Sequence, residues 1–122
     1  MYNYNARLLR VIDGDTVDVE LDLGFDIKTK KRLRLAEINT PECRTKDLKE
    51  KEKGLAAKKR VKDILEENES FEIESTKLGK YGRVLAKIYI VTMDGKQGIT
   101  KKCLNDILLS EGHAIPYFGG KK

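Results

Sequence analysis

Tryptophan is absent from this sequence, histidine occurs once, and cysteine and proline occur twice each. The single histidine, His113, excludes a metal site built from several histidines. Cys43 and Cys103 form neither a Cys-x-x-Cys pair nor a Cys-to-His metal spacing. A domain of this size does not need a disulfide, so two free thiols are the favoured interpretation and a disulfide is the alternative.

Long apolar segments are missing as well. No stretch approaches the roughly 18 apolar residues of a membrane span, so we expect no membrane partner. The first residues show no basic segment followed by an apolar run, so no secretory signal is visible. We expect a cytoplasmic location, with secretion of a processed form as the alternative. The length of 122 residues predicts one domain over residues 1–122, with a monomer as the default.

Positive charge is concentrated in one part of the chain. The net charge is +5, and residues 44–60 contain eight basic against three acidic side chains, so the rest of the chain is balanced. A local basic surface suits a polyanion such as nucleic acid, although a solvated helix face is the commoner explanation of such a segment.

Hydrophobic patterns predict three strands before the first helix, over residues 6–12, 16–23 and 27–38. The second alternates Val17, Val19 and Leu21 with acidic residues, and Asp13-Gly14-Asp15 forms a turn before it. Helical spacing follows over residues 53–68.

Two further strands are predicted over residues 70–76 and 83–91, with an extra strand over residues 99–103. A short helix begins near Leu104, and Gly112 is placed to cap its C-terminus. We therefore expect a mostly-β, α+β protein. Its core is an OB-fold five-stranded Greek-key barrel with one helix after strand three and a short C-terminal helix.

Three short segments have the residue types that phosphodiester hydrolysis requires. They are Asp13-Gly14-Asp15-Thr16, Arg34 followed by Asn39-Thr40-Pro41-Glu42, and Lys80-Tyr81-Gly82-Arg83. Each alone is also an ordinary turn or strand exit. Together they supply carboxylates that can bind a cation or activate water, and guanidinium groups that match phosphate oxygens. They must converge in space for such a site to exist.

These segments resemble the staphylococcal nuclease (thermonuclease) family, and the resemblance runs from about Arg7 to Gly112. It implies an OB barrel, a calcium cofactor and hydrolysis of DNA and RNA with 3′-phosphate products. By the same resemblance Asp15, Asn39 and Thr40 are the expected metal ligands. Arg34 and Arg83 are the expected phosphate-binding catalytic residues, with Glu42 as general base. Lys80, Tyr81 and Tyr117 are expected to bind the substrate.

Two departures from the family pattern affect the metal site. Asn39 stands where the family usually has an aspartate, so one negative charge is missing and we expect looser calcium binding. Strand alternation would place Glu37 on the same side as Asn39, where it could restore the charge; the alternative is a solvent-facing glutamate paired with a lysine. The leading interpretation is a calcium-dependent nuclease. A non-catalytic OB module that binds nucleic acid is the alternative, and a protein-interaction barrel is a third class.

Overall fold

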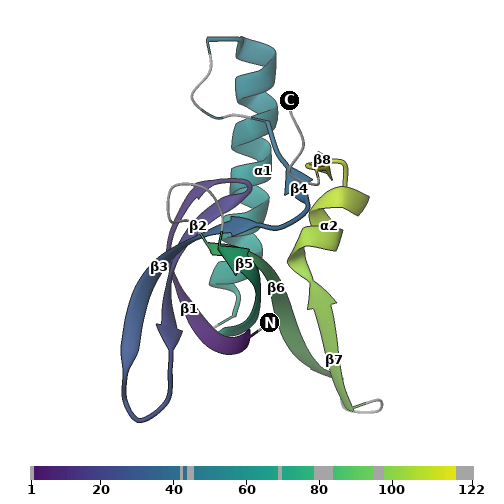
Figure 1. Cartoon of the computed structure of the whole chain (residues 1–122). Helices are drawn as coiled ribbons and strands as arrows, with labels where there is room; N and C mark the ends of the chain where they lie inside the picture. Colours follow the sequence, from purple (N-terminus) through teal and green to yellow (C-terminus); the bar gives the residue numbers. More distant parts are fainter. Residues whose placement is uncertain are drawn as a thin grey trace.

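The fold was determined as a computed structural model that describes residues 2–41, 43, 46–68, 70–78, 84–94 and 98–117. The strands are β1 (Tyr2–Asp13), β2 (Thr16–Asp22), β3 (Lys28–Leu35), β4 (Ile38–Asn39), β5 (Phe71–Leu78), β6 (Val84–Asp94), β7 (Gly98–Cys103) and β8 (Ile115–Pro116). The helices are α1 (Leu48–Glu66) and α2 (Leu104–Ser110). Figure 1 shows the strands curving around one another, with α1 rising from the barrel and α2 at its side.

The strands β1, β2, β3, β6 and β5 close into a barrel. Most neighbours are antiparallel, and β3 closes the barrel by pairing in parallel with β6. β1 is long enough to pair with β5 through its first residues and with β2 through the rest, and two irregularities in its register with β2 help it to curve. This five-stranded closed barrel with two helices is the predicted OB fold, and β7 extends β6 as the predicted extra strand.

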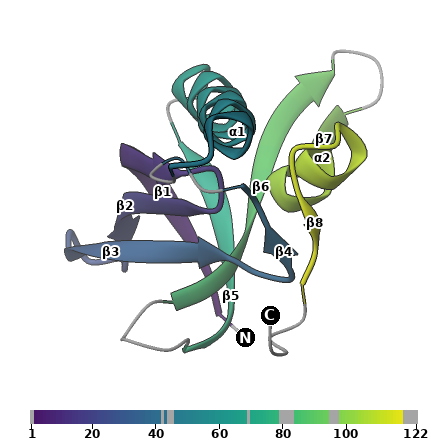
Figure 2. The ribbon, with the colours of Figure 1, turned by 90° about the horizontal axis from the view of Figure 1, so that it is seen from above.

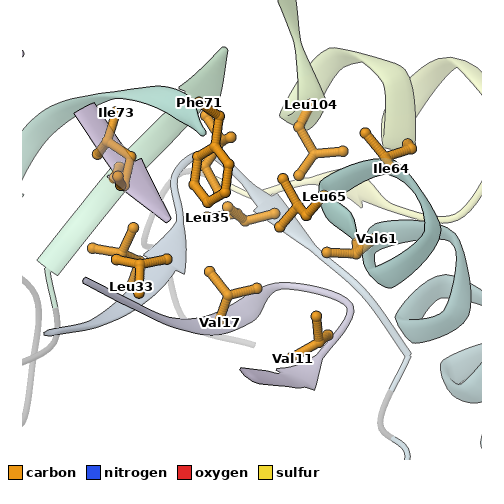
Figure 3. Close-up of a cluster of buried hydrophobic side chains, with 14 of the residues drawn as sticks. Val11, Val17, Leu33, Leu35, Val61, Ile64, Leu65, Phe71, Ile73 and Leu104 are labelled. Atoms are coloured by element: carbon orange, nitrogen blue, oxygen red, sulfur yellow. The ribbon is translucent and has the colours of Figure 1, made fainter. Parts of the chain in front are cut away.

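The core fills the barrel and the space between it and the helices (Figure 3). Strand alternation directs Val17, Leu33 and Leu35 inward, where they meet Phe71 and Ile73. α1 adds Val61, Ile64 and Leu65, and α2 adds Leu104 and Leu108. α1 packs against β1, and α2 packs against β6 and β7, as the view from above shows (Figure 2).

The structure corrects several predicted boundaries: β1 begins at Tyr2 rather than at residue 6, and β6 ends at Asp94 rather than at residue 91. α1 begins at Leu48 rather than Lys53, because Asp47 caps the helix by accepting hydrogen bonds from the backbone of Lys49 and Glu50 at 3.0 and 3.4 Å. The third strand ends at Leu35 rather than at residue 38, because Glu37 takes a left-handed backbone conformation with φ of 65°. The chain then forms β4, which pairs with β8 in a small second sheet that was not predicted.

The end of α2 agrees with the sequence. Gly112 follows the C-cap residue Glu111 with φ of 79°, and its N–H donates to the carbonyl of Leu109 at 3.2 Å. In the part of the chain that the structure describes, no helix has the length and apolar character of a membrane span.

Candidate functional site

Asp15 connects three parts of the barrel that are distant in sequence. It lies in the turn between β1 and β2, and only 8% of the residue is exposed. Its Oδ1 accepts a hydrogen bond from the Thr16 hydroxyl at 3.0 Å, and its Oδ2 accepts one from the Thr40 N–H at 3.1 Å. Its main-chain carbonyl accepts from the Leu35 N–H at 2.8 Å. The turn is therefore tied to the end of β3 and to the segment after β4.

The Arg34 guanidinium lies at the centre of this convergence. Its Nη2 is 3.5 Å from Asp15 Oδ2 and donates to Asn39 Oδ1 at 3.3 Å, while Nη1 donates to the Leu35 carbonyl at 2.9 Å. The carbon Cζ lies 5.9 Å from the centre of the Tyr117 ring, within the range of a cation–π contact. The Arg34 and Asp15 side chains are 13% and 11% exposed. The guanidinium is therefore held in one orientation, close to the surface.

Backbone contacts explain why Asn39 and Tyr117 reach Arg34. After the left-handed residue Glu37, β4 pairs with β8 in the register Asn39 with Ile115. The Tyr117 N–H then donates to the Glu37 carbonyl at 2.9 Å. The segment after α2 thus returns to the end of β3 and brings the aromatic ring to the guanidinium. The identity of Tyr117 suggested a substrate contact, but its contact with Arg34 could be found only from the fold.

Glu37 does not restore the charge that Asn39 lacks. Its Oε2 lies 3.4 Å from Lys87 Nζ, and 53% of its side chain is exposed. The electrostatic attraction of Glu37 is the main cause that raises the pKa of Lys87 above its usual value. The alternation argument was wrong because residues 36 and 37 form a turn and not a strand. The alternative, a solvent-facing glutamate paired with a lysine, is what the structure shows.

Gly14 allows the turn to pack directly against α1. A Cβ atom at this position would lie 2.8 Å from the Cβ of Ala57 and 3.0 Å from the hydroxyl oxygen of Thr40. Real Cβ atoms do not approach a neighbouring Cβ so closely, so the close contact requires glycine. Thr40 Oγ1 is buried and has no hydrogen-bond partner among the described residues. The Asp-Gly-Asp pattern suggested a turn, but not this contact with the helix.

The two cysteines are free thiols, as favoured from the sequence. Burial is the main cause that raises the pKa of both. A hydrogen bond to Asp13 raises the pKa of Cys43 further, which places this thiol beside the β1–β2 turn. Both groups are therefore protonated at neutral pH and are poor nucleophiles.

Oxygen donors at the site match a calcium ion in kind but not in charge. The carboxylate of Asp15 and the amide oxygen of Asn39 face a common point, because both lie within 3.5 Å of the same nitrogen of Arg34. Calcium takes about six to eight oxygen ligands. Within the described ranges, however, no group of three or more His, Cys, Asp or Glu side chains could hold a metal. The point that both oxygens face is occupied by the Arg34 guanidinium, so these donors would hold a calcium ion only weakly, with water among its remaining ligands.

Four of the predicted site residues, Glu42, Lys80, Tyr81 and Arg83, lie outside the described residues. The structure brings together the other five, Asp15, Arg34, Asn39, Thr40 and Tyr117. Their roles in metal binding and catalysis stay predictions.

An apolar cavity in the barrel is separate from the site around Arg34. It has a volume of about 270 Å³ and is lined by residues of β1, β2, β3, β5 and β6, with Leu21, Leu33 and Ile73 among them. Leu33 and Arg34 are consecutive residues of β3, so their side chains point to opposite faces of the sheet. The cavity therefore does not open onto the Arg34 guanidinium.

Comparisons with known proteins identify the family of the chain. A search of curated proteins found no match to the chain. The family model described as staphylococcal nuclease homologue matches residues 32–122, which is most of the chain and includes Arg34, Asn39, Thr40 and Tyr117. Proteins of this family are generally nucleases and act on nucleic acids, so a nuclease-like or nucleic-acid-binding function is indicated for the chain. The chain belongs to the staphylococcal nuclease homologue family.

Proposed function

We propose that this protein is a calcium-dependent nuclease that hydrolyses phosphodiester bonds of DNA or RNA with little sequence preference and leaves 3′-phosphate ends. The observation that carries the proposal is the position of Arg34. Its guanidinium is fixed by Asp15, Asn39 and Tyr117, three residues from separate segments of the chain.

Arg34 is suited to bind the scissile phosphate. A guanidinium is planar, keeps its charge at working pH and matches two phosphate oxygens at once. As water attacks, negative charge gathers on those oxygens, and a donor fixed in advance stabilises that charge without reorganising. Asp15 and Asn39 hold the guanidinium in place before the substrate binds.

Asp15, Asn39 and the main-chain oxygen of Thr40 are the residues that would hold calcium, which supplies a positive charge to the phosphate and to the attacking water. We assign Glu42 as the general base and Arg83 as the second phosphate-binding guanidinium. Lys80 and Tyr81 would bind the adjoining nucleotide. These four assignments rest on the sequence resemblance. Tyr117 presents a half-buried aromatic ring beside Arg34, and stacking on an aromatic ring accepts any base.

The test is digestion of single-stranded DNA with calcium and with a chelator. We expect cleavage with calcium only. Arg34→Lys should lower kcat/KM by about 100-fold to 1,000-fold, because lysine cannot reproduce the planar pair of donors. Arg32→Lys is the matched control: Arg32 is on the same strand, but it is exposed and pairs with Asp18 at 2.8 Å. Its activity should stay within about twofold of the native protein.

One observation favours a second candidate, a nucleic-acid-binding module without catalysis. Among the described residues of the site, the only carboxylate is that of Asp15, which is already paired with Arg34, and the amide of Asn39 adds no charge to attract a cation. Strand binding without cleavage at any calcium concentration would replace the nuclease proposal with this one.

A further inference from the structure

Helix α1 has an excess of positive charge that the rest of the protein leaves largely uncompensated. It contains seven basic residues against four acidic ones. Arg60 pairs with Glu111 at the end of α2 through two hydrogen bonds of 2.7 and 2.9 Å. Across the described ranges, no ion pair joins any lysine of α1 to a carboxylate. These lysines are therefore available to an external anion.

Three of the lysines lie along one side of α1. The buried face consists of Gly54, Ala57, Val61, Ile64 and Leu65. At about 100° per residue, Lys51, Lys58 and Lys62 fall within roughly 40° of one another at one border of this face. Lys51 and Lys62 are exposed and Lys58 is half-buried. We call these three residues the lysine flank. Arg60 lies at the other border and faces α2.

The lysine flank passes the turn that holds Asp15. Ala57 packs against Gly14, and Gly14 immediately precedes Asp15 in the β1–β2 turn. Lys58 directly follows Ala57 in the helix, so the flank passes this turn at Lys58.

The flank is also long enough to contact several phosphates of a nucleic acid strand. Eleven residues separate Lys51 from Lys62, which is about 16 Å along a helix axis. Toward Lys51, α1 extends beyond the barrel strands (Figure 1).

We propose that the lysine flank binds the phosphate backbone of a nucleic acid strand whose scissile phosphate lies at Arg34, so that the preferred substrate is a polynucleotide and not a short oligonucleotide. This inference rests on the proposed function for the position of the scissile phosphate. Lysine binds phosphate as a point charge without reading bases, so the flank adds affinity and no sequence preference. Two features favour nucleic acid over other polyanions: charge complementarity, and the contact of α1 with the turn that holds Asp15 through Ala57 and Gly14.

The experiment compares two triple variants of the full chain. Lys51→Gln, Lys58→Gln and Lys62→Gln together remove the flank. Lys49→Gln, Lys53→Gln and Lys59→Gln remove the same charge from exposed positions elsewhere on α1. Binding of a labelled single strand of about 30 nucleotides, longer than the roughly 4 to 16 that an OB barrel covers, is measured by fluorescence anisotropy with chelator. The salt concentration is varied between about 50 and 200 mM.

We expect the flank variant to lose affinity by about tenfold or more at the lowest salt. The slope of log affinity against log salt should fall by about 2, since each phosphate contact contributes about 0.7 on a single strand. The control variant should change the slope by less than about 0.5. If the triple variant folds poorly, Lys51→Gln and Lys62→Gln alone, both at exposed positions, should each lower the slope by about 0.7.

Cleavage of a dinucleotide should be the same in the native protein and the flank variant, because a dinucleotide reaches only the Arg34 site. Three results would overturn the proposal: unchanged strand binding in the flank variant, equal losses in both triple variants, or an equal loss on the dinucleotide. Because exposed Leu48 and Leu55 border the flank, phosphatidylserine vesicles are a second probe. Vesicle binding that needs the flank, without flank-dependent strand binding, would overturn it as well.

The two proposals fail separately. Should the native protein cleave nothing with calcium while the flank variant still loses strand binding, the catalytic proposal fails and the flank proposal stands. If the native protein cleaves with calcium and the flank variant binds the nucleic acid strand as the native protein does, the flank proposal fails and the catalytic proposal stands.

Discussion

At the scale of the residue, Asn39 sets the charge of the site. Its amide oxygen takes one hydrogen bond from Arg34, and among the described residues that contact this guanidinium only Asp15 carries a negative charge. The positive charge of Arg34 therefore balances the carboxylate before any cation arrives. A divalent ion would meet a locally neutral site, and this is the physical reason to expect weak binding.

We predict that Asn39→Asp tightens calcium binding by about tenfold, because a second carboxylate adds one charge to the ligand set. The measurement is isothermal titration calorimetry with calcium alone, without nucleic acid. Asn5→Asp is the control, since it makes the same charge change at an exposed position on β1. Equal calcium affinities in the native protein and the Asn39 variant would contradict the prediction.

Gly14→Ala should lower the free energy of unfolding by about 1 to 3 kcal/mol, because the added Cβ overlaps the Cβ of Ala57 at 2.8 Å. Urea unfolding gives the difference. Ala57→Gly opens space on the helix, so the double variant should lose less than the sum of the two single variants. Additive losses of stability would show that Gly14 and Ala57 are not coupled by a close steric contact.

At the scale of the element, Asn105 joins α2 to the barrel. It is 2% exposed. Its side-chain amide donates to the carbonyl oxygens of Ala36 and Ala86 at 2.9 and 3.3 Å, and its Oδ1 accepts from the Ile88 N–H at 3.3 Å. Ala36 is the first residue of the turn that leads to Asn39, so these hydrogen bonds connect α2 to the segment that positions Asn39.

We predict that Asn105→Ala costs about 1 to 3 kcal/mol of stability, because the Ile88 N–H and the Ala36 carbonyl lose the hydrogen bonds that Asn105 makes. Chemical denaturation measures this cost. Ser110→Ala is the control on the same helix: its hydroxyl donates to the Ile107 carbonyl at 3.0 Å, but at an exposed position, and its loss should stay below about 0.5 kcal/mol. Similar losses in the two variants would mean that the Asn105 hydrogen bonds contribute little.

At the scale of the whole molecule, the parallel pairing of β3 with β6 closes the barrel. It matches Leu33 with Val84, Arg34 with Leu85, and Leu35 with Ala86. The same strand thus faces the core through Leu33 and Leu35 and presents Arg34 to the site. Closure of the barrel and the position of the guanidinium depend on one set of strand contacts.

Leu35→Ala should therefore destabilise the whole protein by about 2 to 5 kcal/mol, by leaving a cavity at a side chain that is 1% exposed. Unfolding should remain a single transition when followed by circular dichroism and by tyrosine fluorescence, as expected of one cooperative domain. Leu55→Ala, at a position 46% exposed, should change stability by less than about 0.5 kcal/mol. Separate transitions for the two probes would argue against a single core.

The sequence by itself determined the order of the barrel strands and the two helices and the residue types of the site, but not β4 and β8. Alternation along residues 16–23 and the apolar spacing of α1 are local patterns, and local backbone geometry converts them directly into a strand and a helix. The helix was predicted to begin too late, because α1 starts after a capping aspartate and its first turn lacks apolar residues at helical spacing.

Only the tertiary structure decided how the site is assembled. The turn at Glu37, the pairing of β4 with β8, and the contact of Gly14 with Ala57 bring Asp15, Asn39 and Tyr117 to Arg34. The residues in each of these contacts are not separated by a helical or strand period, so no sequence pattern predicts the contact. Their positions follow from how the closed barrel packs against its helices, which no local pattern contains.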